Sequence, residues 1–434
     1  MRTLLTPFLL LGAAFLQAQA PGGMLTAEQA VAIALENNHA VRIAKLDARS
    51  VEVANTAGNA GMLPTLSANG SYAMDNSATK QTFFSGEVRE ADNADSKVLN
   101  GALALNWTVF DGFTMFAAKE RLEAMEAMGK VELRQQLETT AYNVLTGYYM
   151  AVQVKQALAA QRDLIQTSVE RLQIAETGAR IGTISGVALV QARLDLSADS
   201  AAILDLEQQL ALSYNRLNTL LGRPSATPVE VAGDIPPAAA LDLAVIRQEA
   251  ITGNAALQRQ RQAEQISNLR VNELRGALFP RLDVYGNYAY SNSTSSVGFL
   301  QSNTALGPNY GVRISAPIFQ GQRNSKAVQV AKIASEQARI GTDQAQLELE
   351  QQVLDAWTAY DLANRRVAMG QRDLEGMRSL VDVALESYRL GMLTAVELRD
   401  VQQSLLDAEN RVLLAQFEAK SAELLLRLLA GKLM

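Results

Sequence analysis

The chain has 434 residues, 48% of them hydrophobic, which is enough apolar material to fold around a core rather than remain disordered. The formal net charge of −6 arises from an even mixture of signs, leaves no basic patch and excludes nucleic-acid binding. The sequence contains no cysteine and one histidine, His39, which excludes thiol chemistry and most histidine-based catalysis or metal binding. We therefore expect no enzyme and no cofactor, and we expect His39 to be an ordinary surface residue.

The N-terminal segment 1–20 is typical of a secretory signal peptide, with one arginine, a short apolar run and small residues at Ala18 and Ala20, either of which suits cleavage. No later segment reaches the roughly 18 to 20 unbroken apolar residues that a membrane-spanning helix needs. The sequence thus predicts an exported protein that enters a membrane, if at all, as strands.

Each half of the chain carries the same pattern. Seven positions recur at one constant offset: Leu25, Asn38, Val41, Pro64, Leu66, Gly70 and Tyr72 match Leu241, Asn254, Leu257, Pro280, Leu282, Gly286 and Tyr288. Further matches are WTVFDG with APIFQG and RIGTISGVALVQ with RLGMLTAVELRD. The sequence therefore predicts an internal duplication, with a first repeat at 21–222, a proline-rich linker at 223–241 and a second repeat at 242–434.

Each repeat is predicted to run as short helix, strand, loop, strand, very long helix, tight turn and long helix. The first short helix should begin at Thr26, whose side chain can form a capping box with Gln29, and should end before Pro64. The very long helices, at about 113–177 and 322–387, run for about 65 residues, or roughly 100 Å at 1.5 Å per residue.

Four segments alternate between apolar and polar residues, as strands do: 64–74, 99–109, 280–292 and 310–318. Each is close to the roughly 9 to 11 residues that cross a bilayer as a tilted strand. The segments 76–98 and 291–309 are rich in Ser, Asn and Thr, and are predicted to be long external loops. Because four strands cannot close on themselves, a membrane barrel requires oligomerisation, and three copies would supply twelve strands. The alternative is a water-soluble sheet packed on the helices.

The last helix of each repeat has a sustained spacing of three and four residues between apolar positions. In the second repeat this stripe runs from Leu398 to Leu429, and in the first from Leu189 to Leu220 with polar interruptions at Asp199 and Ser213. Such a period over this length predicts coiled-coil packing of helical hairpins.

The duplication, FDG and FQG at the strand-to-helix junctions, and the two hairpin turns resemble the TolC-like outer-membrane factors across essentially the whole mature chain. The resemblance implies a mostly α fold of mixed class, in which the helical hairpins form an α-barrel and four strands per subunit contribute to a twelve-stranded transmembrane β-barrel. It implies a homotrimer among outer-membrane lipid that extends into the periplasm, with the linker near its equatorial region. The expected function is the passive exit duct of a tripartite efflux pump or type I secretion system, with a periplasmic adaptor protein and an inner-membrane transporter as partners.

The resemblance also implies where the functional residues lie. The hairpin turns would form periplasmic tips that dock the adaptor, through Gly182, Thr183, Ile184, Val187, Gly391, Met392, Leu393 and Val396. The pore constriction would be formed by Glu397 and Asp400, at the family's paired acidic positions, together with Tyr388. Glu397 and Asp400 begin a polar stripe that continues through Ser404, Asp407 and Arg411 at helical spacing; without the family context this stripe is a solvated helix face.

In the best-known members, a tyrosine and an arginine of the second hairpin hold the entrance shut by bonding to the first. Tyr388 matches the tyrosine, but Leu393 replaces the arginine and Ala188 replaces the acidic partner, so Arg389 is the remaining candidate cation. The alternative function is a secreted or periplasmic coiled-coil scaffold without pore activity, which differs from a duct because it would not partition with outer membranes.

Overall fold

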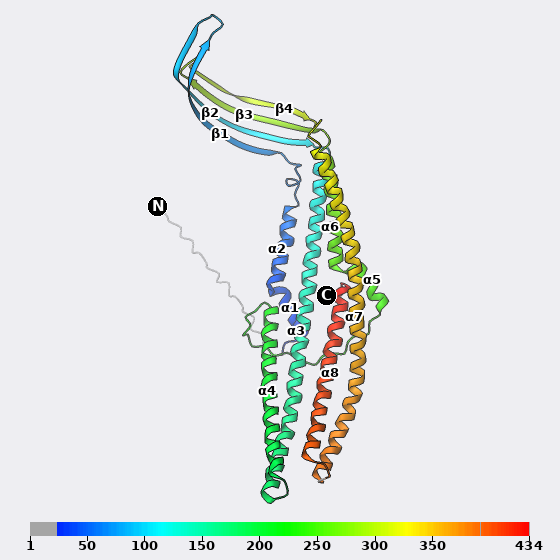
Figure 1. The fold of residues 1–434 in the computed structure, drawn as a ribbon. Helices are drawn as coiled ribbons and strands as arrows, with labels where there is room; N and C mark the ends of the chain where they lie inside the picture. Colours follow the sequence, from blue (N-terminus) through cyan, green and yellow to red (C-terminus); the bar gives the residue numbers. More distant parts are fainter. Residues whose placement is uncertain (1–23, 391, 434) are drawn as a thin grey trace, which may run out of the picture. The chain divides into compact units, whose positions relative to one another are not determined.

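The computed structural model describes residues 24–390 and 392–433, so the predicted signal peptide lies outside the described residues (Figure 1). Its elements are α1 (Ala27–Asn37), α2 (His39–Ala54), β1 (Thr65–Thr82), β2 (Val88–Phe110), α3 (Thr114–Ile181), α4 (Gly186–Leu220), α5 (Leu243–Gly253), α6 (Ala255–Gly276), β3 (Arg281–Ser295), β4 (Ser302–Ser315), α7 (Arg323–Arg389) and α8 (Ala395–Leu429). The order of two helices, two strands and two helices occurs twice, which confirms the predicted duplication.

The short helix predicted at the start of each repeat is in fact two helices. Asn38 has an extended backbone, and its side-chain oxygen accepts hydrogen bonds from the backbone N–H groups of Ala40 at 2.9 Å and Val41 at 3.3 Å. Asn254 does the same for Leu257 at 2.9 Å. Asparagine favours this N-cap role over a helix interior, so the first helix ends and a new one begins at each asparagine.

The chain divides into two compact units. The hairpin unit consists of Asn143–Pro237, Arg366–Phe417 and the described part of Met1–Ala34; the sheet unit consists of the remaining described residues. The long helices α3 and α7, of 68 and 67 residues, contribute to both units and match their predicted extents closely.

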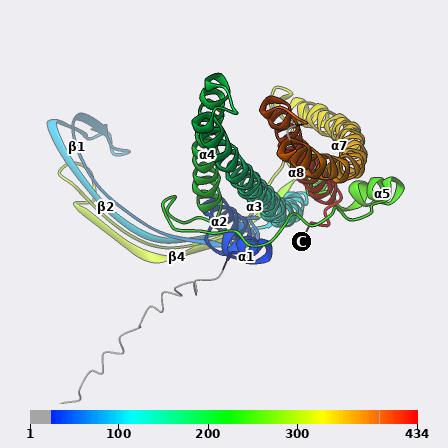
Figure 2. The same cartoon turned by 90° about the horizontal axis from the view of Figure 1, so that it is seen from below.

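The hairpin unit is built from two helical hairpins. The second part of α3 lies beside α4, and the second part of α7 lies beside the first part of α8 (Figures 1 and 2). The predicted apolar stripe of α8 is buried at Leu398, Ala408, Val412 and Ala415. The stripe of α4 is buried at Ala192 and Leu217, and also at its polar interruption Asp199, so a carboxylate occupies a core position of the first hairpin.

The sheet unit contains one antiparallel sheet with the strand order β1-β2-β3-β4 (Figure 1). Residues paired directly across strands point to the same face, and the register pairs Leu66 with Leu105 and Leu103 with Tyr288. The alternating apolar positions of all four strands therefore lie on one face of the sheet. This face also carries Tyr72, Leu99, Trp107, Val284, Tyr310, Val312 and Ile314. Many of these side chains are exposed in this chain, including Leu66 at 72% and Tyr310 at 82%.

The strands extend well into the segments predicted as long loops, which corrects that prediction. The connection between β1 and β2 is reduced to residues 83–87, and that between β3 and β4 to 296–301. Polar cross-strand pairs stabilise the added length: Asn76 donates a 2.6 Å hydrogen bond to its partner Asp95, and Lys80 forms an ion pair with its partner Glu90. Among the described residues, no helix is long and apolar enough to cross a membrane.

The FDG and FQG motifs are the points where strands become helices. In the first, Gly112 has φ +70°, and a side chain at that position would meet the carbonyl oxygen of Gly276 at 2.3 Å, so glycine is required for both reasons. In the second, Gly321 also has a positive φ, of +61°. The motifs thus let the chain bend sharply from the sheet into the long helices.

The apolar core of the sheet unit lies where α5 to α8 meet. Its buried members are Ile246, Ala250, Leu257, Leu349, Val353, Ala356, Tyr360, Ala422, Leu426, Leu429 and Ala430. The Tyr360 hydroxyl donates a hydrogen bond of 2.5 Å to the carbonyl of Ala239 in the linker. In the hairpin unit, Tyr148 makes the same kind of contact with the carbonyls of Leu25 and Ala232. Each repeat therefore uses one buried tyrosine of its long helix to hold part of the linker.

Candidate functional site

The turn between α3 and α4 is a compact loop closed by its own hydrogen bonds. Gly182 adopts φ +80°, a conformation that ends the helix and favours glycine. The backbone N–H groups of Thr183 and Ile184 both donate to the carbonyl of Gly178, at 2.8 and 3.2 Å. Ser185 then caps α4 with its side chain. These interactions give the first tip a fixed backbone.

The turn between α7 and α8 is fixed by a capping box. The hydroxyl of Thr394 accepts from the Glu397 N–H at 3.2 Å, and the Thr394 N–H and hydroxyl donate to the Glu397 carboxylate at 2.8 and 2.7 Å. These hydrogen bonds, first that of the backbone and then that of the side chain, lower the pKa of Glu397. Glu397 therefore has a structural role as well as a negative charge at neutral pH. Gly391 lies outside the described residues.

The two turns expose apolar side chains. Val187 is 80% exposed, Met392 70% and Val396 59%, whereas Ile184 and Leu393 are partly buried. Both turns thus present large apolar side chains to the surface.

The polar stripe predicted on α8 is largely exposed in this chain. Glu397, Asp400, Asp407 and Arg411 all lie on the surface, and the Ser404 hydroxyl donates to the backbone carbonyl of Asp400 at 2.8 Å. The stripe is therefore free to face solvent or a neighbouring molecule.

Tyr388 and Asp400 line one pocket of about 490 Å³ within the hairpin unit. Side chains from α3, α4, α7 and α8 contribute to its walls. Glu397 is not among the described residues that line it, so the structure brings together two of the three residues predicted for the constriction.

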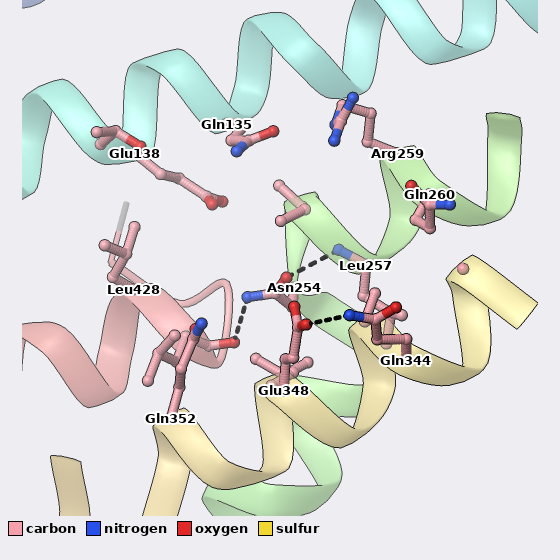
Figure 3. A pocket seen from close by; sticks show the side chains of 17 residues that line it. Gln135, Glu138, Asn254, Leu257, Arg259, Gln260, Gln344, Glu348, Gln352 and Leu428 are labelled. Carbon is pink, nitrogen blue, oxygen red and sulfur yellow. Dashed lines mark hydrogen bonds between the residues drawn. The ribbon is translucent and has the colours of Figure 1, made fainter. Parts of the chain in front are cut away.

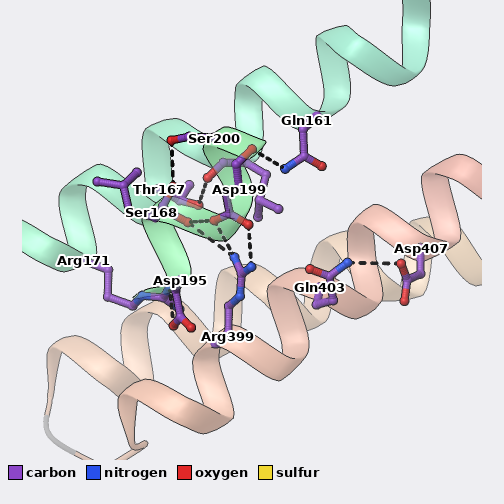
Figure 4. Close-up of polar contacts among 12 residues, drawn as sticks. Gln161, Thr167, Ser168, Arg171, Asp195, Asp199, Ser200, Arg399, Gln403 and Asp407 are labelled. Carbon is purple, nitrogen blue, oxygen red and sulfur yellow. Dashed lines mark hydrogen bonds and ion pairs between the residues drawn. The ribbon is translucent and has the colours of Figure 1, made fainter. Parts of the chain in front are cut away.

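A buried ion pair joins the two hairpins (Figure 4). Arg399 of α8 donates from both terminal nitrogens to the carboxylate of Asp199 of α4, one of these bonds being 2.7 Å long. The Ser168 hydroxyl of α3 donates to the same carboxylate at 2.6 Å. The Asp199 side chain is 4% exposed and that of Arg399 17%, so this charge-assisted contact is sequestered from water.

A second buried arginine lies beside this pair. Arg171 of α3 has a side chain that is 2% exposed and donates to Asp195 of α4 at 2.9 Å (Figure 4). Burial lowers the pKa of the Arg171 guanidinium, and the neighbouring Asp195 carboxylate opposes that shift. The other carboxylate oxygen of Asp195 accepts from Gln191 at 2.8 Å.

The tyrosine–arginine lock that the resemblance implies is not the contact that joins the hairpins here. Leu393 and Ala188 carry no charge, and Arg389, the remaining candidate cation, pairs with Glu386 of its own helix at 3.7 Å. The charged link between hairpins comes instead from Arg399 and Asp199.

The contacts of Arg399 and Arg171 are not predicted from the sequence. Asp199 did give a signal, since it interrupts an apolar stripe at a position that must be buried, and a buried carboxylate requires a partner. The residue that would supply the cation lies 200 positions away, on another hairpin, and nothing in the local pattern identifies it.

The sheet unit contains a second, more polar pocket of about 490 Å³ (Figure 3). Asn254 bridges its walls by donating to the carbonyl of Leu429 at 3.0 Å, and Gln344 donates to Glu348 at 2.8 Å. Burial raises the pKa of Glu138, which lies on the same pocket. Within residues 24–390 and 392–433, no group of three or more His, Asp or Glu side chains is arranged to hold a metal ion.

Comparison with known proteins gives a consistent result over most of the chain. The family model for outer membrane efflux proteins matches residues 30–223 and 246–432. The outer membrane efflux protein BepC of Brucella suis is 23% identical, with 74% of this chain and 71% of BepC covered. The alkaline protease secretion protein AprF of Pseudomonas aeruginosa is also 23% identical, covering 92% of this chain and 83% of AprF. A crystal structure of CusC has the same fold, with a TM-score of 0.78 at 18% identity over 93% of this chain and 92% of CusC.

Proposed function

Because the chain belongs to the outer membrane efflux protein family, and is thus an outer-membrane exit duct that extends into the periplasm, we propose that three copies assemble into one passive conduit. The expected resemblance to TolC-like outer-membrane factors is confirmed at the level of the family. This family consists of channels rather than enzymes, and the coiled-coil scaffold without a pore is accordingly the weaker reading.

The observation that carries the trimer proposal is the exposed apolar face of a sheet with two edges, β1 and β4. Hydrocarbon favours such a face but does not tolerate edges whose backbone groups lack partners. Joining β1 of one copy to β4 of the next removes every edge. Three copies give twelve strands, a number that closes a barrel with an open interior.

We propose that Glu397, Asp400 and Tyr388 form the constriction of this conduit. In a trimer each residue occurs three times around the axis, and rings of carboxylates select cations. The exposure of Glu397 and Asp400 supports this assignment, as does the lowered pKa of Glu397, which keeps its charge at neutral pH.

We further propose that the hairpin tips bind a periplasmic adaptor protein, which connects the duct to an inner-membrane transporter that supplies the energy. The contact residues are Gly182, Thr183, Ile184 and Val187 at the first tip and Gly391, Met392, Leu393 and Val396 at the second. The exposed apolar side chains of Val187, Met392 and Val396 support this role. AprF is a protein of alkaline protease secretion and CusC one of cation efflux, so relatives of this fold serve different cargoes.

The entrance is held shut, in this proposal, by the Arg399–Asp199 pair in place of the lock whose positions hold Leu393 and Ala188. The pair joins the first hairpin to the second within one subunit and is buried. Opening that separates α4 from α8 must break it.

The first test is to fractionate expressing cells, purify the protein from the envelope in detergent, and measure its mass and its single-channel conductance. A trimer from the outer-membrane fraction with cation-preferring conductance is expected, and a soluble monomer without conductance would return the protein to the scaffold interpretation. Glu397→Gln with Asp400→Asn should then lower the cation preference. Glu176→Gln, which removes an exposed carboxylate from α3, is the control and should not change it.

A further inference from the structure

The pocket between the two hairpins contains a buried cation whose hydrogen-bonding capacity is largely unused. Arg171 lines this pocket, and its Nε and Nη1 atoms are buried without a hydrogen-bond partner among the described residues. A guanidinium has five N–H donors, and Asp195 receives one of them at 2.9 Å. Leaving the donors of a buried charged group unmatched is unfavourable, so this position is suited to an acceptor from outside the chain.

The neighbouring charged groups do not compete for that acceptor. Asp195 already accepts from Arg171 with one oxygen and from Gln191 with the other. The Arg399 guanidinium is engaged by both oxygens of Asp199. Arg171 is therefore the group in the pocket that remains available to a new anion.

The other residues that line the pocket indicate the polarity, size and charge of the rest of the ligand. Ala175, Ile184, Ala188 and Val396 are apolar and come from α3, the first turn, α4 and α8. The volume of about 490 Å³ lies within the range of sites that hold small organic molecules. Asp400 also lines the pocket and is exposed, so its negative charge disfavours a ligand with a second anionic group.

We propose that this pocket binds an amphiphilic monocarboxylate, with the carboxylate on the free donors of Arg171 and the apolar body against the alanine and aliphatic side chains. A planar carboxylate can accept two parallel N–H bonds from the end of a guanidinium, here one from Nη1 and one from the second hydrogen of Nη2, which gives the site its preference for this group. Such a ligand would contact all four helices and so bridge the two hairpins of one subunit. The inference rests on the geometry of the hairpin unit and requires neither the trimer nor conduction.

The test is calorimetric titration of the full-length protein in lipid nanodiscs, with octanoate as the probe and empty nanodiscs as the blank. Octanoate should bind at least tenfold more tightly than octanol, which has the same apolar body without the charge, and more tightly than the dianion suberate. Equal binding of octanoate and octanol would refute the role of Arg171, and equal binding of suberate would refute that of Asp400. Absence of saturable binding would show that water alone satisfies the arginine and would refute the site itself.

Two variants and a control locate the binding. Arg171→Met should reduce octanoate affinity at least tenfold and leave octanol unchanged, because it removes the donors and keeps the length of the side chain. Ala188→Leu fills the pocket without touching the charges, and should weaken both ligands even if Arg171→Met folds poorly. Arg162→Met removes an arginine of the same helix that pairs with Glu207 outside the pocket, and should bind octanoate like the unaltered protein. Unchanged octanoate affinity in both pocket variants would overturn the proposal.

Discussion

Substitutions at the Arg399–Asp199 pair should have opposite effects when made singly and when combined. Each single substitution should favour the open state of the duct, whereas the double substitution should not. Asp199→Leu leaves the Arg399 guanidinium in a site where its side chain is 17% exposed, and Arg399→Met leaves a carboxylate that is 4% exposed. Removing one member of a buried pair costs about 3 to 5 kcal/mol, mostly because the other charge stays desolvated. If opening separates α4 from α8, the stranded group regains water, so the cost falls on the closed state alone.

The size of the effect follows directly. A change of about 1.4 kcal/mol is a tenfold change in an equilibrium constant, so each single substitution should shift the closed-to-open equilibrium by about a hundredfold or more in each subunit. Asp199→Leu combined with Arg399→Met replaces the pair by apolar side chains of similar size, a change that is often neutral or stabilising. The double variant should therefore be closed at least as much as the unaltered protein.

The assay is the open fraction of single channels in a planar bilayer, supported by the sensitivity of cells to a large hydrophilic antibiotic. Arg162→Met is the matched control, because its exposed partner Glu207 lies on the same hairpin and such a pair contributes less than about 1 kcal/mol. A double variant that opens as far as the two singles together would refute the reasoning, and so would singles that stay closed.

Three further results are expected. In an Asp400→Asn background, Thr394→Val should raise the pKa of Glu397 part of the way back toward its ordinary value, because it removes the side-chain hydrogen bond and keeps the larger backbone one. As the pH falls, cation selectivity should then disappear at a higher pH in this variant than where Thr394 is retained. Glu138 has a raised pKa, so the stability that it contributes is present below pH 4.5 and is lost as the pH rises. Glu138→Gln should therefore raise the melting temperature at pH 8 and not at pH 4. An equal rise at both pH values would contradict this. Tyr148→Phe should destabilise the hairpin unit by about 1 kcal/mol and speed proteolysis of the linker 223–241. An unchanged cleavage rate would show that the hydrogen bonds of the Tyr148 hydroxyl do not hold the linker.

The sequence predicted the architecture well because the architecture depends on period and repetition. Alternation placed the four strands, the spacing of three and four residues placed the hairpins, and the capping box at Thr26 is present, with hydrogen bonds of 3.1 and 3.3 Å to and from Gln29. The prediction from composition was wrong where the local residue preference favours a loop but strand pairing keeps the chain extended. Residues 76–98 are polar enough to be loop, but long-range strand pairing, as between Asn76 and Asp95, keeps most of them extended.

The site was predictable only in part, for a related physical reason. The hairpin turns and the acidic stripe lie at local motifs, so the resemblance could propose functional residues for them one by one. The contacts of Arg399 and Arg171 depend on which helices lie together, and a single arginine among many gives no local sign of its burial. Asp199 is an example of what the sequence does indicate. A polar residue in an apolar stripe predicts that a partner exists, but not which residue it is.

The same interruption explains why a charge pair suits this interface better than one more leucine. Apolar stripes with a repeating spacing can pack in several registers, because a shift along the helix by a whole repeat returns similar contacts. A shift of even one helical turn, about 5.4 Å, takes the Arg399 guanidinium out of hydrogen-bonding reach of Asp199. The pair thus selects one register at some expense in stability, as buried polar groups do in coiled coils. We accordingly expect the double apolar variant to close into several states that differ in residual conductance, one for each register. A single residual conductance would show that packing alone fixes the register.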